Sequence, residues 1–157
     1  MRTRCMTEAD LPQAMEIARG LPEAPHWPEA AYRAALDPDG QPRRTALVAE
    51  DAPGRVAGFA VACRVGEEAE LELICVAARE QRRGIGRRLL RALIEDLKRN
   101  GVTKVQLEAR ASNRAALGLY AALGFEQTGV RPRYYDDPQE DAVLMVLRLT
   151  GFSEPVG

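Results

Sequence analysis

The chain has 157 residues, a formal net charge of -1, 46% hydrophobic residues and 29% charged residues. This length fits one domain with its own core, which we expect over residues 1–152, followed by a short tail at 153–157. The small net charge gives no sign of nucleic-acid or membrane binding, and no apolar stretch is long enough to span a bilayer. Because the N-terminus is polar and does not resemble a secretion signal, we expect a cytoplasmic protein.

Three cysteines and one histidine limit the possible metal and nucleophile chemistry. Cys5, Cys63 and Cys75 have no metal-like spacing, and each lies in a strand-like run. We therefore expect buried, reduced thiols. Because His26 is the single histidine, a histidine-based metal site is disfavoured, and no metal is expected.

The first half of the chain predicts a short strand, two helices and a three-stranded meander. Thr7 can cap a helix whose apolar residues recur at helical spacing as far as Gly20. Prolines in residues 21–28 break the chain, and later strands alternate with turns. The predicted elements are a strand at 2–6, helices after residue 7 and at 29–36, a turn at 37–40, and strands at 45–50, 56–65 and 69–76.

The second half predicts an alternation of strands and helices. A broad apolar stripe from Ile85 to Leu97 indicates a long helix, which Asn100-Gly101 ends. The strand–helix–strand unit through residues 84–100 predicts a parallel pair with a right-handed crossover. The whole order predicts an α+β fold with a mixed sheet. The remaining predicted elements are a strand at 105–109, a helix at 113–123, and strands at 125–130 and 143–149.

A glycine- and arginine-rich segment follows the strand that ends at Val76. Gln81 to Gly86 reads Gln-Arg-Arg-Gly-Ile-Gly, and the segment from Arg79 to Arg91 holds six arginines and one glutamate. Glycines let the backbone approach a ligand, and free N–H groups at a helix start bind phosphate. This favours a polyanionic ligand, although a solvated arginine face is the alternative. The P-loop lysine and the glycine spacing of a dinucleotide fingerprint are both absent.

The Gln-x-x-Gly-x-Gly pattern resembles the acetyl-coenzyme A loop of the Gcn5-related N-acetyltransferases. Residues 119–125, Leu-Tyr-Ala-Ala-Leu-Gly-Phe, resemble the Tyr-x-x-x-Gly-Phe segment of that family. The resemblance extends from about Glu68 to Leu149 and is weak before Thr45. It implies the fold of that family, a mixed and mostly antiparallel sheet of about six or seven strands flanked by about four helices.

Other segments resemble a narrower group, the bacterial ribosomal-protein alanine N-acetyltransferases. They are Glu108 to Asn113, Arg133-Tyr134-Tyr135 with residues 140–142, and His26-Trp27-Pro28. Two positions depart from this group, with Leu73 in place of asparagine and Ala77-Ala78 in place of Asp-Pro.

The resemblance implies acetyl-coenzyme A as co-substrate and no metal. Backbone groups of Ile74, Cys75 and Val76 would hold the pantetheine arm and polarise the thioester carbonyl. A nucleophilic role for Cys75 is disfavoured because no histidine motif partners it. Asn113 would lie near the pantetheine. The loop residues implied to bind the cofactor are Arg82, Arg83, Gly84, Ile85, Gly86 and Arg87.

Glu108 is the candidate general base. It shares a strand face with Gln106, opposite the apolar residues, and its carboxylate could take a proton from an amine. An α-amine has a pKa near 8, so a modest base suffices. The alternative is a surface glutamate paired with Lys104 or Arg110.

Tyr120 is the candidate acid, because the matching tyrosine of the family protonates the departing thiolate. The alternative is a core aromatic, since Leu117, Tyr120 and Leu123 share one helical face.

Acceptor recognition is expected at two places. Glu70 and Glu72 are expected on the strand face opposite Leu71, Leu73 and Cys75, where Glu72 could bind a cationic amine or form an exposed edge. Tyr134 and Tyr135 are expected in a loop between the last strands and suit peptide contact.

The expected function is direct acetyl transfer to a protein N-terminal amine, with the N-terminal alanine of a small-subunit ribosomal protein as the best match. Alternative acceptors are a small amine, a polyamine or a lysine side chain. A non-catalytic acyl-coenzyme A sensor is the alternative of another class, and a nucleotide-phosphate module is weaker still. We expect a monomer or homodimer without direct nucleic-acid or membrane contact.

Overall fold

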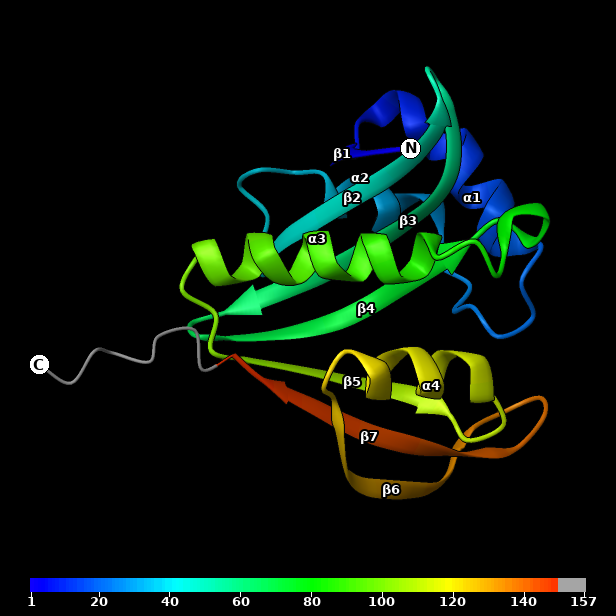
Figure 1. Ribbon diagram of the computed structural model, residues 1–157, viewed down its shortest axis with the longest axis vertical. Coiled ribbons are helices and arrows are strands. Elements are labelled where there is room, and N and C mark those ends of the chain that lie inside the picture. Colours follow the sequence, from blue (N-terminus) through cyan, green and yellow to red (C-terminus); the bar gives the residue numbers. More distant parts are fainter. Residues whose placement is uncertain (150–157) are drawn as a thin grey trace, which may run out of the picture.

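A seven-stranded mixed sheet organises residues 1–149, the part of the chain that this computed structural model describes (Figure 1). The strand order is β1-β2-β3-β4-β5-β7-β6, and all neighbours are antiparallel except β4 and β5. This confirms the predicted α+β fold and its parallel pair. The strands are β1 (Arg2–Cys5), β2 (Arg43–Ala52), β3 (Arg55–Val65), β4 (Glu68–Val76), β5 (Lys104–Arg110), β6 (Glu126–Tyr135) and β7 (Glu140–Arg148).

Four helices cover the sheet, two on each face (Figure 1). Helices α1 (Leu11–Arg19) and α2 (Glu29–Ala35) lie on one face, and α3 (Ile85–Arg99) and α4 (Arg114–Ala122) on the other. Thr7 caps a short 3-10 turn before α1, as its capping pattern predicts. No helix within residues 1–149 is long and apolar enough to cross a membrane. The predicted tail at 153–157 lies outside the described residues.

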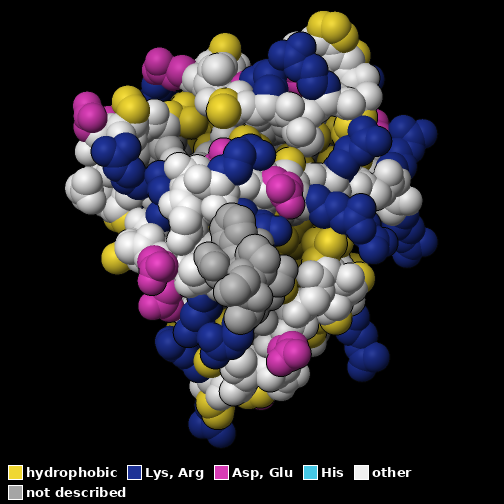
Figure 2. All heavy atoms as spheres, turned by 60° about the vertical axis from the view of Figure 1, so that its left-hand side comes forward, with side chains coloured by type: hydrophobic (Ala, Val, Ile, Leu, Met, Phe, Trp, Pro, Cys, Tyr) yellow, Lys and Arg dark blue, Asp and Glu magenta, His cyan; other side chains and the backbone are white. Residues whose placement is uncertain are grey.

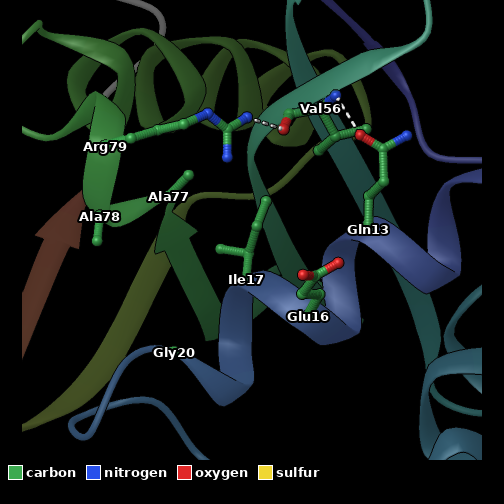
Figure 3. Close-up of a pocket in the computed structure, with 8 residues that line it drawn as sticks. All are labelled: Gln13, Glu16, Ile17, Gly20, Val56, Ala77, Ala78 and Arg79. Atoms are coloured by element: carbon green, nitrogen blue, oxygen red, sulfur yellow. Dashed lines mark hydrogen bonds between the residues drawn. The ribbon is translucent and has the colours of Figure 1, made fainter.

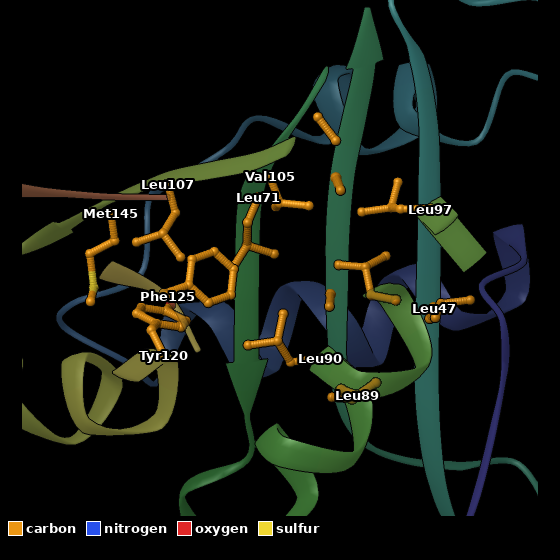
Figure 4. Close-up of a cluster of buried hydrophobic side chains, with 14 of the residues drawn as sticks. Leu47, Leu71, Leu89, Leu90, Leu97, Val105, Leu107, Tyr120, Phe125 and Met145 are labelled. Atoms are coloured by element: carbon orange, nitrogen blue, oxygen red, sulfur yellow. The ribbon is translucent and has the colours of Figure 1, made fainter. Parts of the chain in front are cut away.

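Two buried clusters hold the layers together. The first joins α3 and α4 to the sheet, and Leu89, Leu90, Leu93 and Leu97 of α3 are completely buried in it (Figure 4). The second joins α1 and α2 to the opposite face, around Phe59. The apolar residues of α3 face the sheet along the length of the helix. Because α3 contacts β2, β3 and β4, it fixes these central strands relative to one another.

A β-bulge in β4 reverses the faces of its side chains. Ala62 pairs with Leu71 but Val61 pairs with Leu73, so Glu72 is an extra residue. Leu71 consequently packs in the first cluster, whereas Leu73 packs in the second with Cys75. The prediction that these three apolar residues share one face was wrong, because the bulge breaks strict alternation.

Two other expectations differ from the structure. β6 continues to Tyr135, so Tyr134 and Tyr135 lie in a strand and not in a loop, because the strand passes through an irregularity after Arg131 and pairs again with β7 at Glu140. Cys5 is exposed, since it lies on the edge strand β1, whereas Cys75 is buried as expected.

The parallel pair β4–β5 is very short. Only Glu68 to Glu70 of β4 pair with Lys104 to Gln106 of β5. Beyond these residues the two strands separate (Figure 1). Within residues 1–149, the edge of β4 that faces β5 therefore has no strand partner after Glu70.

We expect Gly58→Ala to lower the free energy of unfolding by about 1–3 kcal/mol. An added Cβ would lie 2.8 Å from the Cys75 carbonyl oxygen of β4 and 3.1 Å from Leu89 Cδ1 of α3, so β3 must shift relative to β4 and α3. Gly118→Ala is the matched control, because its Cβ meets nothing within 4 Å in helix α4. Alanine there should raise stability by about 0.5–1 kcal/mol. Urea denaturation measures both, and equal stability of the two variants would contradict the packing argument.

Candidate active site

The loop between β4 and α3 has the backbone of an anion site. Gly84 caps α3 with a left-handed φ of 77°, and Arg82 has a φ of 68°. The first N–H groups of a helix have no acceptor within it, and its dipole favours negative charge there. An added Cβ at Gly84 would meet nothing within 4 Å, so its open side leaves room for a ligand. At Gly86 a Cβ would lie 3.3 Å from Leu119 Cδ2, so this glycine lets α3 and α4 pack closely.

Exposed arginines surround this helix start. On the face drawn in Figure 2, Lys and Arg side chains gather along one border of the molecule. Uncompensated cationic groups beside a helix N-terminus suit a polyanion better than a solvated ion-pair network does. No carboxylate in the described part of the chain forms an ion pair with four of these exposed arginines: Arg82, Arg87, Arg88 and Arg91.

The unpaired edge of β4 adjoins the loop. Ile74 to Val76 pair with β3 on one side, through Ala60 and Gly58, while the side that faces β5 has no strand partner in the described part of the chain. Such an edge offers N–H and C=O groups to an extended, amide-containing chain. Burial raises the pKa of the Cys75 thiol to about 12, so it is not a thiolate at neutral pH. The predicted packing role of Cys75 is therefore favoured.

Glu108 lies on β5 with its apolar neighbours on the opposite face, as predicted. Its Oε1 is 3.6 Å from Arg131 Nη1. Hydrogen bonding with Glu108 raises the pKa of the Tyr134 hydroxyl. The partners considered from sequence are engaged elsewhere, since Lys104 pairs with Glu68 and Arg110 pairs with Glu140. Glu108 is thus set between two side chains of β6.

Three carboxylates approach one another from β4 and β5. Partial burial, followed by the charges of Glu72 and Glu108, raises the pKa of Glu70. Glu72 accepts from Arg44 at 2.9 and 3.3 Å, and the Arg44 guanidinium lies 6.0 Å from the centre of the Trp27 ring. Arg44 therefore balances the charge of Glu72, and Arg131 lies 3.6 Å from Glu108, so that among the described residues Glu70 is the carboxylate of the three that forms no ion pair.

Tyr120 is buried in the first cluster, with its ring centre 5.8 Å from that of Phe125. Burial, with smaller contributions from Cys75 and Tyr135, raises the pKa of Tyr120 far above the usual phenol value. The hydroxyl is therefore protonated at neutral pH, the state that a hydrogen-bond donor requires. Core packing and donation are compatible, because packing holds the ring in one place.

Asn113 caps helix α4. Its Oδ1 accepts from the backbone N–H of Ala116 at 3.2 Å. This leaves the side-chain nitrogen as the group that could contact a ligand, because the oxygen is engaged by the helix.

The end of β6 presents an aromatic pair that β5 braces. The ring centres of Tyr134 and Tyr135 are 5.1 Å apart, and Arg110 lies 4.5 Å above the Tyr135 ring. Glu140 accepts from the Ser112 N–H at 2.6 Å, which ties the β6–β7 connection to the end of β5. Since Tyr134 is 47% exposed, it offers an apolar surface beside Glu108.

A separate pocket of about 270 Å³ lies between α1 and the segment 77–79 (Figure 3). Gln13 holds its rim by accepting from the Val56 N–H at 2.9 Å, and Arg79 donates to the Val56 carbonyl at 3.2 Å. None of the predicted site residues lines it; the lining residues are Gln13, Glu16, Ile17, Gly20, Val56, Ala77, Ala78 and Arg79.

Sequence reasoning missed Arg131, Arg44 and the buried Glu80. The periodicity of a strand gives no register, so the contacts of Arg131 and Arg44 with glutamates on other strands had no signal. Glu80 was visible as the single acidic residue of an arginine-rich segment. Within residues 1–149, no group of three or more His, Cys, Asp or Glu side chains is arranged to hold a metal ion.

Comparison with known proteins gives one consistent result. The family described as "Acetyltransferase (GNAT) family" matches residues 11–125. The [ribosomal protein bS18]-alanine N-acetyltransferase of Salmonella typhimurium is 38% identical over 147 residues, which cover 92% of this chain and 95% of that protein. The N-alpha-acetyltransferase RimI of Mycobacterium tuberculosis is 39% identical over 146 residues, which cover 89% of this chain and 87% of that protein.

Solved structures agree in fold. The crystal structure of the ribosomal-protein-S18-alanine N-acetyltransferase from Escherichia coli matches with a TM-score of 0.82 and 34% identity. The match covers 99% of this chain and 98% of that chain.

We expect Gly84→Glu to weaken acetyl-coenzyme A binding at least about tenfold, or about 1.4 kcal/mol. The substitution places a negative charge and bulk at the helix start. Gly101→Glu is the matched control, because Gly101 also has a left-handed φ and open space but lies beyond the other end of α3. Calorimetry on the folded variants measures both affinities. Equal loss in the two variants, or no loss at Gly84, would contradict this site.

Proposed function

Because the chain belongs to the GNAT family of acetyl-coenzyme A-dependent N-acetyltransferases, we propose that it acetylates the N-terminal amine of a protein. The observation that carries this proposal is Glu108 on β5, set between Arg131 and the exposed aromatic Tyr134. A carboxylate there can take a proton from an amine, while the aromatic surface beside it suits a peptide.

The N-terminal alanine of a small-subunit ribosomal protein is the best specific candidate. Two relatives named for that alanine support it, one by sequence over 95% of its length and one by structure. Leu73 and Ala77-Ala78 depart from the pattern of that group, but Leu73 and Ala77 are buried in the second cluster and do not offer a surface to an acceptor.

Acetyl-coenzyme A supplies the acetyl group as a thioester. The β4–α3 loop would hold its diphosphate through Arg82, Arg83, Arg87 and the free N–H groups of Gly84 to Gly86. The open edge at Ile74 to Val76 would pair with the amides of the pantetheine arm. These residues place the thioester without forming a covalent bond to it.

In the proposed reaction the neutral amine attacks the thioester carbonyl, so that a C–N bond forms and the C–S bond breaks. Glu108 accepts the amine proton, through water where distance requires it. Tyr120 donates a hydrogen bond and then its proton to the departing sulfur. Glu108 then releases its proton to solvent, and Tyr120 takes a proton from solvent, which restores the enzyme.

A second acceptor class has one observation in its favour. Glu70, Glu72 and Glu108 gather negative charge that a polyamine or a lysine side chain could use. Arg44 pairs with Glu72 and Arg131 with Glu108, however, which weakens this case. The acyl-coenzyme A sensor differs by lacking turnover, so release of free thiol in the presence of an acceptor separates it.

We expect a peptide with a free N-terminal alanine to give a specificity constant at least about tenfold above that of spermidine or an internal-lysine peptide. At neutral pH the neutral fraction of an α-amine, with a pKa near 8, exceeds that of a lysine amine by about two orders of magnitude. Initial rates at one pH measure this, with the N-blocked alanine peptide as control. Preference for spermidine or lysine would reject the N-terminal acceptor and leave the acetyltransferase activity intact.

We expect Tyr120→Phe to lower kcat about a hundredfold with little change in the KM for acetyl-coenzyme A. Phenylalanine keeps the packing against Phe125 and removes the hydroxyl. Tyr32→Phe is the matched control, because Tyr32 is also buried but belongs to the second cluster. Its kcat should equal that of the wild type. If both variants retain full turnover with chemistry rate-limiting, Tyr120 is a packing residue.

A further inference from the structure

The one acidic residue of the arginine-rich segment is buried. Glu80 is 6% exposed, although it lies in the loop proposed to bind a polyanion. Its Oε2 is 2.9 Å from Arg83 Nη1, and its Oε1 is 3.8 Å from Arg79 Nε. Only the carboxylate is buried, since the Arg83 side chain is 70% exposed, and a buried carboxylate requires such a partner. Glu80 is thus held by the arginines that flank it.

Glu80 links the first part of the β4–α3 loop, which is anchored to β3, to the second part, which leads into α3. The start is anchored, since the Glu80 N–H donates to the Ala77 carbonyl at 2.8 Å and Arg79 donates to the Val56 carbonyl of β3. The second part of the loop begins two residues after Glu80, where Arg82 and Gly84 take left-handed conformations on either side of Arg83. The Glu80–Arg83 pair is therefore a brace across the residues that lead into α3.

Charge alone gives the opposite expectation for this position. A carboxylate beside a site for coenzyme A repels the diphosphate, so its removal should tighten binding. A brace that fixes the loop backbone helps the ligand, because binding then loses less conformational freedom. The two effects differ in sign, which makes the role of Glu80 measurable.

We propose that Glu80 is a positioning residue for the diphosphate of acetyl-coenzyme A, acting through Arg83 and the backbone of the β4–α3 loop. This inference rests on the proposed binding of acetyl-coenzyme A at that loop. Glu80 itself touches no substrate. It holds the left-handed turn in place, so that Arg83 and the first N–H groups of α3 are ordered before the ligand arrives.

The test compares two acetyl donors on the Glu80→Gln variant. Acetyl-coenzyme A carries the diphosphate, whereas S-acetylpantetheine lacks it and uses only the β4 edge. We expect kcat/KM for acetyl-coenzyme A to fall about fivefold to tenfold, through KM, while kcat/KM for S-acetylpantetheine stays within twofold. General damage to the fold would lower both values together, and that outcome would overturn the proposal.

Two further variants complete the design. Glu95→Gln is the control for loss of one negative charge, because Glu95 is exposed on α3 and, among residues 1–149, its ion-pair partner is Lys98. The kcat/KM values for both donors should be unaffected. If Glu80→Gln does not fold, Glu80→Asp replaces it, because aspartate keeps the negative charge but its side chain is one methylene shorter. The ratio of kcat/KM between the two donors is then measured on this variant. Unchanged or tighter use of acetyl-coenzyme A by the folded variant would overturn the proposal. Failure of the wild type to bind acetyl-coenzyme A would instead reject the proposed function.

Discussion

The early separation of β4 from β5 is the constraint on which the rest of the site depends. Two parallel strands that stay paired would satisfy each other's backbone groups, but here pairing ends at Glu70 and Gln106. The bulge at Glu72 directly follows this point and turns Leu73 toward the opposite core. Within residues 1–149, the separation leaves the edge of β4 that faces β5 without a strand partner beyond Glu70. The completely buried leucines of helix α3 pack against the sheet, and α3 contacts β2, β3 and β4. On its other side, β5 pairs with β7.

The two sides of this opening carry opposite charges. Around the start of α3 the exposed arginines have few acidic partners, which suits a polyanionic donor. Toward β6 lie the carboxylates Glu70 and Glu108, together with Arg131 at 3.6 Å from Glu108, and a carboxylate there suits an amine that arrives as a cation and must lose a proton. Tyr120 is buried in the first cluster, with its ring centre 5.8 Å from that of Phe125.

Local patterns in the sequence predicted the helices and strands well, but they predicted the spatial arrangement of these elements poorly. The apolar stripe of α3, the glycine stop after it and the glycine-rich loop are short-range signals, and the structure has those elements where they were expected. The order β5-β7-β6 has no local signal, so the approach of Arg131 to Glu108 could not be read from the chain. The bulge at Glu72 also escaped prediction, because alternating polar and apolar residues continue through it without interruption.

The insertion of β7 between β5 and β6 has a consequence for the order of synthesis. β6 reaches the sheet only through β7, the last strand of the described chain, so Arg131 and Tyr134 cannot take their places beside Glu108 until β7 has docked. A nascent chain that leaves the ribosome N-terminus first can form the β1–β4 meander and α3 early. The proposed acceptor side is completed only after β7 has been made and docked, so a copy that lacks β7 would have no complete acceptor face.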